Sequence, residues 1–398
     1  MSKTEKPSIR FHGFDDTWEQ RKLGDNIAEY TEKTTINNQY PVLTSSRRGI
    51  FFQTDYYDGN QIASADNTGY NIVPYGYFTY RHMSDDEIFH FNINDITENG
   101  IVSTLYPVFT TDENLDSRYL QYQLNYGKEF AKYAVLQKQG GSRTYMYLNK
   151  LKELRLTIPN FVEEQKKISA YFMKLDNFIT LRQRKFEKLT NVKKSMLEKM
   201  FPQNGSCYPA VRFKGFTGPW ERRKFGDVFE EYSEKNRADL PPLTIIQGSG
   251  TIRRDESERA LQYDKASLSN YKVVNEGDLI VHLRSFEGGL EKANSQGIIS
   301  PAYHTFHGEG VDSRFYYTYF RSKNFIDTDL KPHVYGIRDG RSIDIEGMKT
   351  IEIPFTSYPE QKLIGDAIDS INTLISLQRR ELEKLQSIKK ALLEKMFV

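Results

Sequence analysis

Two stretches decide the fold of this chain: IPNFVEEQKKISAYFMKLDNFITLRQRKFEKLTNVKKSMLEKMF, residues 158–201, and IPFTSYPEQKLIGDAIDSINTLISLQRRELEKLQSIKKALLEKMFV, residues 353–398. Each begins with Ile-Pro and passes through Glu-Gln-Lys into a segment whose apolar residues recur at alternating steps of four and three. A seven-residue repeat of this length is typical of a coiled-coil helix. We therefore predict two helices of about 38 residues, roughly 57 Å long at ~1.5 Å per residue.

The recurring apolar positions form a seam, the stripe through which the two helices are expected to pack. Polar residues occupy the skipped seam positions, Arg182 and Lys193 in the first helix and Gln378 and Lys389 in the second. Arg182 and Gln378 are expected to fix the helix register, as buried polar groups do in coiled coils. The predicted seam residues are Ile168, Phe172, Leu175, Ile179, Phe186, Leu189, Ile364, Ile368, Ile371, Ile375, Leu382 and Leu385.

The two helices close the halves of a tandem repeat that runs through nearly the whole chain. IRFHGF at residues 9–14 recurs as VRFKGF at 211–216, and WEQRKLGD at 18–25 recurs as WERRKFGD at 220–227. Further matches link 100–103 to 297–300 and 116–119 to 312–315, with an offset that drifts only from 202 to 195. Such a repeat indicates two copies of one structural plan. The copies share almost nothing in 34–69 and 236–270, or in 82–98 and 285–296.

Each half mixes short strand-like runs with helical segments, so we expect two α/β or α+β domains, each followed by a long helix. The second domain begins where the first helix ends and finishes where the second helix begins. Antiparallel pairing brings both of these connections to one end of the helix pair, and it predicts an antiparallel coiled coil with pseudo-two-fold symmetry. The expected boundaries are 1–160 for the first domain, 161–201 for its helix, 202–210 for a linker, 211–355 for the second domain and 356–398 for its helix.

Composition limits the class of protein without identifying it. With 398 residues, 38% of them hydrophobic, the chain has the composition of a globular protein of two or three domains. The single cysteine, Cys207, excludes a disulfide framework and a cysteine-rich zinc site. A polar start and the lack of long apolar runs predict a soluble, cytoplasmic protein. The net charge of +2 is too small to indicate nucleic-acid binding by itself.

The catalytic and metal-binding motifs that we considered do not fit this sequence. An adenine methyltransferase needs an Asn/Asp-Pro-Pro-Tyr/Phe motif, and the nearest run, Ile72–Tyr75, lacks its polar residue and its second proline. The glycines at Gly248 and Gly250 are followed by TIRR rather than by Gly-Lys-Ser/Thr, so we expect a hairpin turn there and no phosphate loop. The seven histidines are scattered, and only His304 and His307 lie close together. No catalytic residue and no metal site are expected.

Two domains, each followed by Ile-Pro, a Glu-Gln-Lys helix start and a long helix, resemble the specificity (S, HsdS) subunits of type I restriction–modification systems. The most diagnostic residues are LTIP at 156–159 before EQKKI at 164–168, and IEIP at 351–354 before EQKLI at 360–364. The run GIISPAY at 297–303 also looks like the core of that family's recognition domain. The resemblance extends from about Ile9 to Phe397.

The resemblance implies a non-catalytic subunit that recognises a bipartite, asymmetric DNA target with one half-site per recognition domain. It also implies double-stranded DNA, two methyltransferase subunits and restriction subunits as partners. S-adenosylmethionine, ATP and Mg would be bound by those subunits, with no cofactor on this chain. The outer faces of the helices are candidates for docking the methyltransferase subunits.

Two alternatives belong to other classes of protein. A stand-alone DNA methyltransferase or endonuclease with duplicated domains is disfavoured by the missing motifs. A structural coiled-coil adaptor is disfavoured because its two domains would have no need to diverge while its helices match.

Comparison of the halves separates structural from DNA-reading candidates. The shared Trp18/Trp220, Phe14/Phe216 and Tyr30/Tyr232 are interpreted as packing residues, and Asp116 and Asp312 as helix N-caps.

The best candidates for DNA contact are basic or amide residues of divergent, glycine-containing loops, since these side chains can bond guanine or adenine bidentately. Arg143 and Arg341 occupy the same place in both halves, as nearly do Arg81 and Arg284, which suggests phosphate contacts at least as strongly as base contacts. The candidates are Arg47, Arg48, Arg81, Gln137, Lys138, Gln139, Arg143, Gln247, Arg253, Arg254, Arg284, Arg338 and Arg341.

Overall fold

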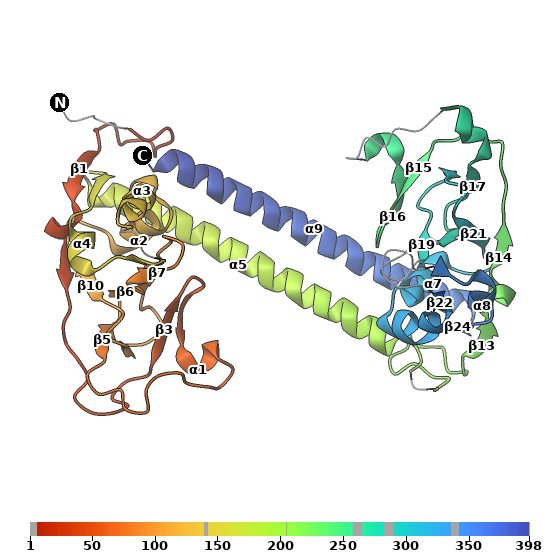
Figure 1. Ribbon diagram of the computed structural model, residues 1–398, viewed down its shortest axis with the longest axis horizontal. Helices are drawn as coiled ribbons and strands as arrows, with labels where there is room; N and C mark the ends of the chain where they lie inside the picture. The colour runs from red at the N-terminus through yellow and green to blue at the C-terminus, as the bar shows by residue number, and fades with distance from the viewer. Residues whose placement is uncertain are drawn as a thin grey trace. The chain divides into compact units, whose positions relative to one another are not determined.

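The computed structural model describes residues 6–138, 142–203, 205–257, 265–281, 290–335 and 342–397. The chain divides into two compact units (Figure 1): unit 1 comprises Met1–Arg182 and Glu381–Val398, and unit 2 comprises Gln183–Arg380. Each unit therefore holds one domain, the start of the long helix that follows this domain, and the end of the other long helix. Both units are assembled from the same set of parts.

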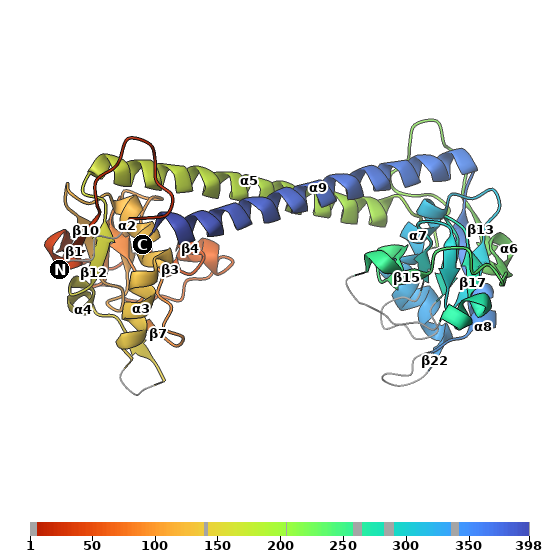
Figure 2. The ribbon, with the colours of Figure 1, turned by 90° about the horizontal axis from the view of Figure 1, so that it is seen from above.

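Small antiparallel sheets form the domain of unit 1. Its strands are β1 (Glu19–Lys22), β2 (Ile27–Glu29), β3 (Leu43–Ser46), β4 (Gly49–Phe52), β5 (Asn71–Pro74), β6 (Phe78–Thr79), β7 (Met83–Ser84), β8 (Asn92–Ile93), β9 (Asn99–Val102), β10 (Val108–Thr111), β11 (Thr144–Tyr145) and β12 (Arg155–Ile158). The largest sheet has the order β2-β10-β6-β8, and β3 pairs with β4, β5 with β9 and β7 with β11. Strands β1 and β12 also pair and lie side by side in Figure 2. Phe78 stacks on Phe109 at the centre of the largest sheet, with ring centroids 4.6 Å apart.

The domain of unit 2 repeats this plan. Its strands are β13 (Glu221–Lys224), β14 (Glu230–Tyr232), β15 (Leu243–Ile246), β16 (Gly250–Arg253), β17 (Lys272–Val274), β18 (Leu279–Val281), β19 (Leu290–Lys292), β20 (Gly297–Ile299), β21 (His304–His307), β22 (Val334–Tyr335), β23 (Ser342–Ile343) and β24 (Glu352–Phe355). The order β14-β21-β18-β19 corresponds to β2-β10-β6-β8 of unit 1. The pairs β13–β24, β15–β16 and β17–β20 correspond to β1–β12, β3–β4 and β5–β9.

Short helices cover these sheets. They are α1 (Gln53–Tyr56), α2 (Ser117–Tyr126), α3 (Lys128–Leu136), α4 (Leu148–Lys152), α6 (Phe225–Val228), α7 (Ser313–Phe320) and α8 (Ile345–Lys349), with 3-10 turns at Leu23–Asp25, Arg254–Glu256, Lys265–Asn270 and Lys331–His333 and a π-helix at Phe325–Leu330. The predicted N-caps are confirmed. The Asp116 carboxylate accepts a hydrogen bond from the Tyr119 N–H (2.8 Å), and the Asp312 carboxylate accepts one from the Arg314 N–H (2.9 Å).

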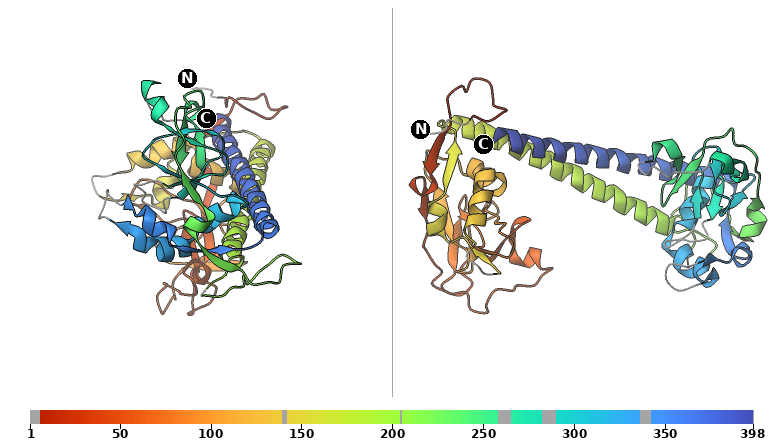
Figure 3. Two further views of the ribbon diagram at one scale, coloured as in Figure 1. Left: turned by 90° about the vertical axis from the view of Figure 1, so that its right-hand side faces the viewer. Right: turned by 45° about the horizontal axis from the view of Figure 1, so that its top comes forward.

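The two long helices are α5 (Val162–Lys199) and α9 (Tyr358–Met396), and they pack against each other in antiparallel fashion (Figure 3). Within unit 1, Asp176 of α5 forms an ion pair with Lys389 (2.6 Å), and Arg182 forms one with Glu381 (2.7 Å). Residue numbers rise along α5 while those of its partners on α9 fall. The predicted fold class, two mixed α/β domains with an antiparallel pair of long helices, is confirmed.

All twelve predicted seam residues are buried or half-buried, because the seven-residue repeat keeps one stripe of each helix covered. The buried ones are Ile168, Phe172, Leu175, Ile364, Ile368 and Leu382, and the half-buried ones are Ile179, Phe186, Leu189, Ile371, Ile375 and Leu385. Gln378 is buried in the same stripe. Arg182 differs from expectation: its side chain is 40% exposed, since it reaches out of the seam toward Glu381.

The last residues of each long helix pack into the domain that belongs to the other half of the repeat. Phe397 stacks on Phe172 with centroids 5.8 Å apart and joins the core of unit 1. Phe201 meets Trp220 edge-on at 6.0 Å and joins the core of unit 2. This contact was not predicted, although the run LEKMF occurs at both 197–201 and 393–397. The repeated Met-Phe pair is thus an apolar anchor for each helix end.

The glutamate of each Glu-Gln-Lys motif forms a buried ion pair with an arginine near the start of its domain. Glu164 is fully buried and accepts two hydrogen bonds from Arg10, at 2.6 and 2.8 Å. Glu360 is likewise buried, and it accepts two from Arg212 at the same distances and one from Trp220 Nε1 at 3.1 Å. These paired charges tie the first segment of each domain to the start of its own helix, and they explain why the motif is repeated.

The Gln of the same motif ties the helix start to the N-cap of a second helix. Gln165 Oε1 accepts from the Asp116 N–H at 2.8 Å, and Gln361 Oε1 accepts from the Asp312 N–H at 3.0 Å. The residues on which the family resemblance rests are therefore framework residues.

Candidate nucleic-acid interface

In unit 1, three of the predicted DNA-contact residues converge on one acidic run, Asp85–Glu87, in the loop that follows β7. They come from three segments: the β3–β4 turn, the end of α3, and the residues just before β11. Because β11 pairs with β7, the last of these segments is held beside the acidic run. The ion pairs are Arg47 with Asp86, Lys138 with Glu87, and Arg143 with Asp85 (2.9 Å between Nε and Oδ1).

These pairs lie at the surface and can exchange partners. The side chains of Arg47 and Arg143 are 57% and 51% exposed, and exposed ion pairs contribute little to stability. The Arg47 guanidinium, together with the Ser84 hydroxyl, lowers the pKa of Asp86 to about 2. A phosphate group offers the same guanidinium and ammonium groups equivalent acceptor oxygens. The site is thus a group of three cations, each paired with a carboxylate of the acidic run.

Two further candidates of unit 1, Arg48 and Gln137, adjoin members of this group in the chain. Arg48 sits over the rings of Phe51 and Tyr56, 5.7 and 5.5 Å from their centroids. Gln137 caps the C-terminal end of α3 through its backbone N–H. Gln139 lies outside the described residues.

A pocket of about 260 Å³ opens beside the β3–β4 turn. It brings Arg47 together with Arg81, and His90 and Tyr106 also line it. The hydroxyl of Thr44, another lining residue, is buried and has no hydrogen-bond partner within the described part of the chain. Such basic, aromatic and hydroxyl groups can bond or stack against a nucleotide.

The candidates of unit 2 divide into two classes. Gln247 lies exposed in the β15–β16 turn, and the exposed Arg253 pairs with Asp255 (3.1 Å). Arg254 is half-buried: its guanidinium lies 5.7 Å from the Tyr271 ring centroid and donates to the Leu243 carbonyl at 3.4 Å. Its placement indicates packing rather than DNA contact. Arg284, Arg338 and Arg341 lie outside the described residues.

The stretches 34–69 and 236–270, which appear unrelated in sequence, contain the same hairpin. The Ile101 N–H donates to the Pro41 carbonyl at 2.9 Å, and the Ile298 N–H donates to the Pro241 carbonyl at 3.0 Å. PVLT at 41–44 and PPLT at 241–244 were the signal that sequence comparison overlooked.

The tips of the two hairpins differ in length and chemistry. Two residues, Arg47 and Arg48, separate the paired Ser46 and Gly49 in unit 1. Three residues, 247–249, separate the paired positions 246 and 250 in unit 2, which confirms the hairpin turn expected at these glycines. The two domains therefore present different tips on one scaffold.

Of the shared aromatic residues, the two tryptophans are buried, and Phe14, Phe216, Tyr30 and Tyr232 are half-buried. Trp18 and Trp220 are 2% and 3% exposed and belong to the two main cores. Phe14 lies under the Lys167 ammonium of α5, 4.7 Å from the ring centroid. The interpretation of the two tryptophans as packing residues is confirmed, so they are unavailable for base stacking.

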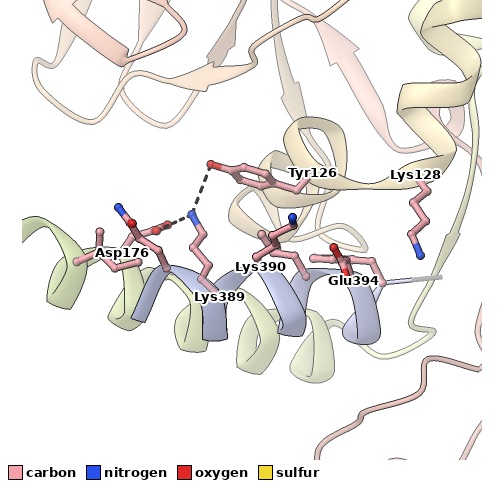
Figure 4. Close-up of a pocket in the computed structure, with 10 residues that line it drawn as sticks. Tyr126, Lys128, Asp176, Lys389, Lys390 and Glu394 are labelled. Carbon is pink, nitrogen blue, oxygen red and sulfur yellow. Dashed lines mark hydrogen bonds and ion pairs between the residues drawn. The ribbon is translucent and has the colours of Figure 1, made fainter. Parts of the chain in front are cut away.

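A second pocket of unit 1, of about 580 Å³, lies between the end of α2 and the two long helices (Figure 4). Lys389 points into it, donates to the Tyr126 hydroxyl (3.4 Å) and forms the ion pair with Asp176. Lys128 and Lys390 also line this pocket, above an apolar base that includes Phe397. None of the predicted DNA-contact residues that the structure describes lines it, so this pocket belongs to the helix pair rather than to the candidate DNA interface.

The two neighbouring histidines are bound to carboxylates. His304 Nδ1 lies 2.5 Å from Glu231, and His307 Nδ1 lies 2.7 Å from Asp278. In the ranges that the structure describes, no three His, Cys, Asp or Glu side chains are grouped to hold a metal ion. Over the same ranges, no helix has the length and apolar character needed to cross a membrane.

Comparisons with known proteins agree with this architecture. The model of the type I restriction modification DNA specificity domain matches residues 15–191. A Methanocaldococcus jannaschii protein assigned as a type I restriction enzyme MjaX specificity subunit is 23% identical over 300 residues, which are 70% of this chain and 67% of its own length. The type I restriction enzyme MjaVIII specificity subunit of the same organism is 25% identical over 315 residues, 74% of this chain and 72% of its own.

A solved structure shows the same fold. The S subunit of a type I restriction-modification system from M. genitalium aligns with a TM-score of 0.61 at 12% identity, over 99% of each chain. The duplicated domains, the antiparallel helices and these comparisons agree: residues 15–191 match the type I restriction modification DNA specificity domain, and the chain is similar to type I specificity subunits over most of its length.

Proposed function

We propose that this chain is the non-catalytic DNA-recognition subunit of a type I restriction–modification complex and binds a bipartite, asymmetric target with one half-site per unit. The observation that carries the proposal is the shared hairpin with unlike tips. Matching frameworks serve what both domains must do, and the tips, Arg47-Arg48 against Gln247–Ser249, supply different base contacts. An adaptor without a DNA-reading role would have no use for this difference.

Binding at unit 1 begins with an exchange of anions. Arg143 and Lys138 leave Asp85 and Glu87 for phosphate oxygens, which positions the domain on the duplex. Arg47, at the tip of the hairpin, leaves Asp86 for a base edge in the major groove. The acidic run then lies close to DNA, where a carboxylate can accept from the amino group of cytosine.

The catalytic chemistry belongs to other subunits in this proposal. Two methyltransferase subunits, with S-adenosylmethionine, and restriction subunits, with ATP and Mg, assemble on this chain. The long helices expose large apolar residues outside the seam: Phe178 and Leu181 on α5 are 57% and 60% exposed, and Leu374 and Leu377 on α9 are 44% and 48% exposed. Both pairs are separated by the same offset of 196 residues (374 − 178 and 377 − 181). A repeated exposed apolar pair, one in each unit, supports two equivalent docking sites for the methyltransferase subunits.

The docking sites can be tested by charge substitution. Leu181→Glu should lower occupancy by one methyltransferase subunit, Leu377→Glu should lower occupancy by the other, and the double variant should bind none. Native mass spectrometry of the reconstituted complex measures this stoichiometry. Ile62→Glu, at a residue that is 66% exposed and lies outside the long helices, is the matched control. Full occupancy in the double variant would place the docking surface elsewhere.

The recognition function itself is tested in the host. Single-molecule methylation mapping with and without this gene should reveal one bipartite motif that loses its methylation when the gene is deleted. An unchanged methylome would refute the proposal. The purified chain alone should neither methylate nor cut DNA, and activity of either kind would favour a stand-alone enzyme.

A further inference from the structure

We propose that one buried polar side chain in each unit sets the geometry of its hairpin tip, and thereby the base preference of its half-site: Asn92 in unit 1 and Glu291 in unit 2. These are positioning residues, which do not themselves contact DNA. The inference rests on the proposed recognition function and assigns part of its specificity to residues outside the tips.

In unit 1, the amide of Asn92 holds the two residues that precede the tip. Asn92 belongs to β8, at the edge of the four-stranded sheet, and is only 7% exposed. Its Nδ2 donates to Ser45 Oγ at 2.8 Å and to the Ser46 carbonyl at 2.9 Å. Ser45 Oγ in turn donates to the Thr79 carbonyl at 3.1 Å, which joins the hairpin to β6. The backbone entering Arg47 is therefore fixed from inside the domain.

In unit 2, the carboxylate of Glu291 holds the turn itself. Glu291 belongs to β19, the strand that corresponds to β8, and is 5% exposed. It accepts hydrogen bonds from the Gly248 N–H at 2.7 Å and the Gly250 N–H at 3.2 Å. Its two oxygens thus reach the turn on both sides of Ser249.

The charge of Glu291 is compensated within the domain. Tyr317 donates its hydroxyl to Glu291 Oε2 at 2.6 Å, and Arg321 lies 3.1 Å from Oε1. Burial and this hydrogen bond raise the pKa of Tyr317 above its usual value, so the hydroxyl remains a donor. A buried carboxylate with four donors is a rigid support, since removal of any partner leaves a desolvated group unpaired.

The chemistry of each support matches its own tip. An amide donates to the carbonyl and hydroxyl oxygens of the two-residue turn, whereas a carboxylate accepts from the N–H groups of the glycine turn. Gly250 has φ +78°, and a Cβ at this position would lie 2.5 Å from the Lys292 carbonyl oxygen, so only glycine fits.

The match explains why two separate stretches diverge together. The tips lie in 34–69 and 236–270, and the supports lie in 82–98 and 285–296, the two pairs of stretches in which the halves share almost nothing. A new tip needs a new support, because bidentate base contacts depend on side chains held within a few tenths of an ångström. Phosphate contacts tolerate more movement, so a loosened tip should lose base discrimination before it loses affinity.

The test compares Asn92→Ala and Glu291→Gln in the full chain with its methyltransferase partners. Each complex selects duplexes from two pools, in which one or the other half-site of the parent target is randomised. Glu291→Gln should lower base preference about tenfold at one half-site and leave the other unchanged, and Asn92→Ala should do the reverse. The unaffected half-site shows that the complex is assembled and bound.

Glu231→Gln is the matched control. Glu231 lies on β14 of the same sheet and pairs with Lys349 (2.7 Å) and His304 (2.5 Å), which both lie outside the hairpin. This variant should change neither half-site. Unchanged preference in both test variants, or an equal loss at both half-sites, would overturn the inference. A parent complex that selects no bipartite target would instead refute the proposed function.

Discussion

The acidic run Asp85–Glu87 offers the sharpest test of the interface in unit 1. A triple variant that changes both aspartates of this run to Asn and its glutamate to Gln removes three carboxylates but preserves their shape. It leaves Arg47, Lys138 and Arg143 without their ion-pair partners. In the parent protein this cluster is neutral, so contact with DNA displaces internal carboxylates and releases few counterions. In the variant, three uncompensated cations face the DNA.

The magnitude follows from the number of ion pairs. Each phosphate neutralised adds about 0.9 to the slope of log K against log salt. On a duplex that lacks the target, Arg47 has no preferred base edge and is expected on a phosphate, as are Lys138 and Arg143. Three freed cations should therefore steepen the slope by about 2.7. Lowering the salt concentration from about 200 to about 50 mM is a roughly fourfold change. With the extra slope of about 2.7, this change should increase the binding constant of the variant about 40-fold more than that of the parent.

Fluorescence anisotropy with a duplex that lacks the target, titrated at several salt concentrations, measures both slopes. The matched control replaces Glu19, Glu29 and Glu153 with Gln, which also removes three carboxylates that pair with basic residues of unit 1. This control should change the slope by much less, because its cations lie outside the predicted contact residues. Parallel slopes for the parent and the acidic-run variant would refute the interface.

Three further outcomes are expected. Phe397→Ala and Phe201→Ala should each lower the free energy of unfolding by about 3–5 kcal/mol in urea titrations, because each removes a buried helix anchor; a loss below about 1 kcal/mol would contradict the docking of the helix ends. Arg47→Ala should raise the pKa of Asp86 from about 2 toward 3.8, because the ionised carboxylate loses its main donor; NMR titration of the carboxyl group measures this pKa. In the parent protein the ion pair adds stability above pH 3.8, and this stability disappears as the pH falls through about 2. An unchanged pKa of Asp86 in the variant would exclude the ion pair. Added to the acidic-run variant, in which Arg143 has lost its carboxylate partner, Arg143→Ala should flatten the salt slope of DNA binding by about 0.9, and equal affinity at every salt concentration would remove Arg143 from the phosphate contacts.

The long helices and the duplication could be predicted because their signals are periodic and local. A seven-residue repeat specifies which stripe of α5 and α9 is covered, and connectivity alone requires the antiparallel direction. The outward reach of Arg182 could not be predicted this way. The side chain is long enough to leave the seam, and its partner Glu381 is distant in sequence.

The interface was less accessible to sequence reasoning because its contacts arise from tertiary structure. The meeting of Arg143 with Asp85 depends on the pairing of β7 and β11, two strands of two residues each, which leave no periodic signal. Arg254 looks like an exposed loop cation in sequence, but packing against Tyr271 covers it. The supporting roles of Asn92 and Glu291 follow from hydrogen bonds to the hairpin backbone, which residue type alone does not reveal.

The most direct test of the central claim, that each unit reads its own half-site, is an exchange of one reading surface. Residues 34–98, which carry the hairpin, its support and the acidic run of unit 1, are replaced with the corresponding stretch of a specificity subunit that has a different target. Single-molecule methylation mapping should then show a motif with one new half and with the other half and the spacing retained. A motif that changes in both halves, or in neither, would contradict the account.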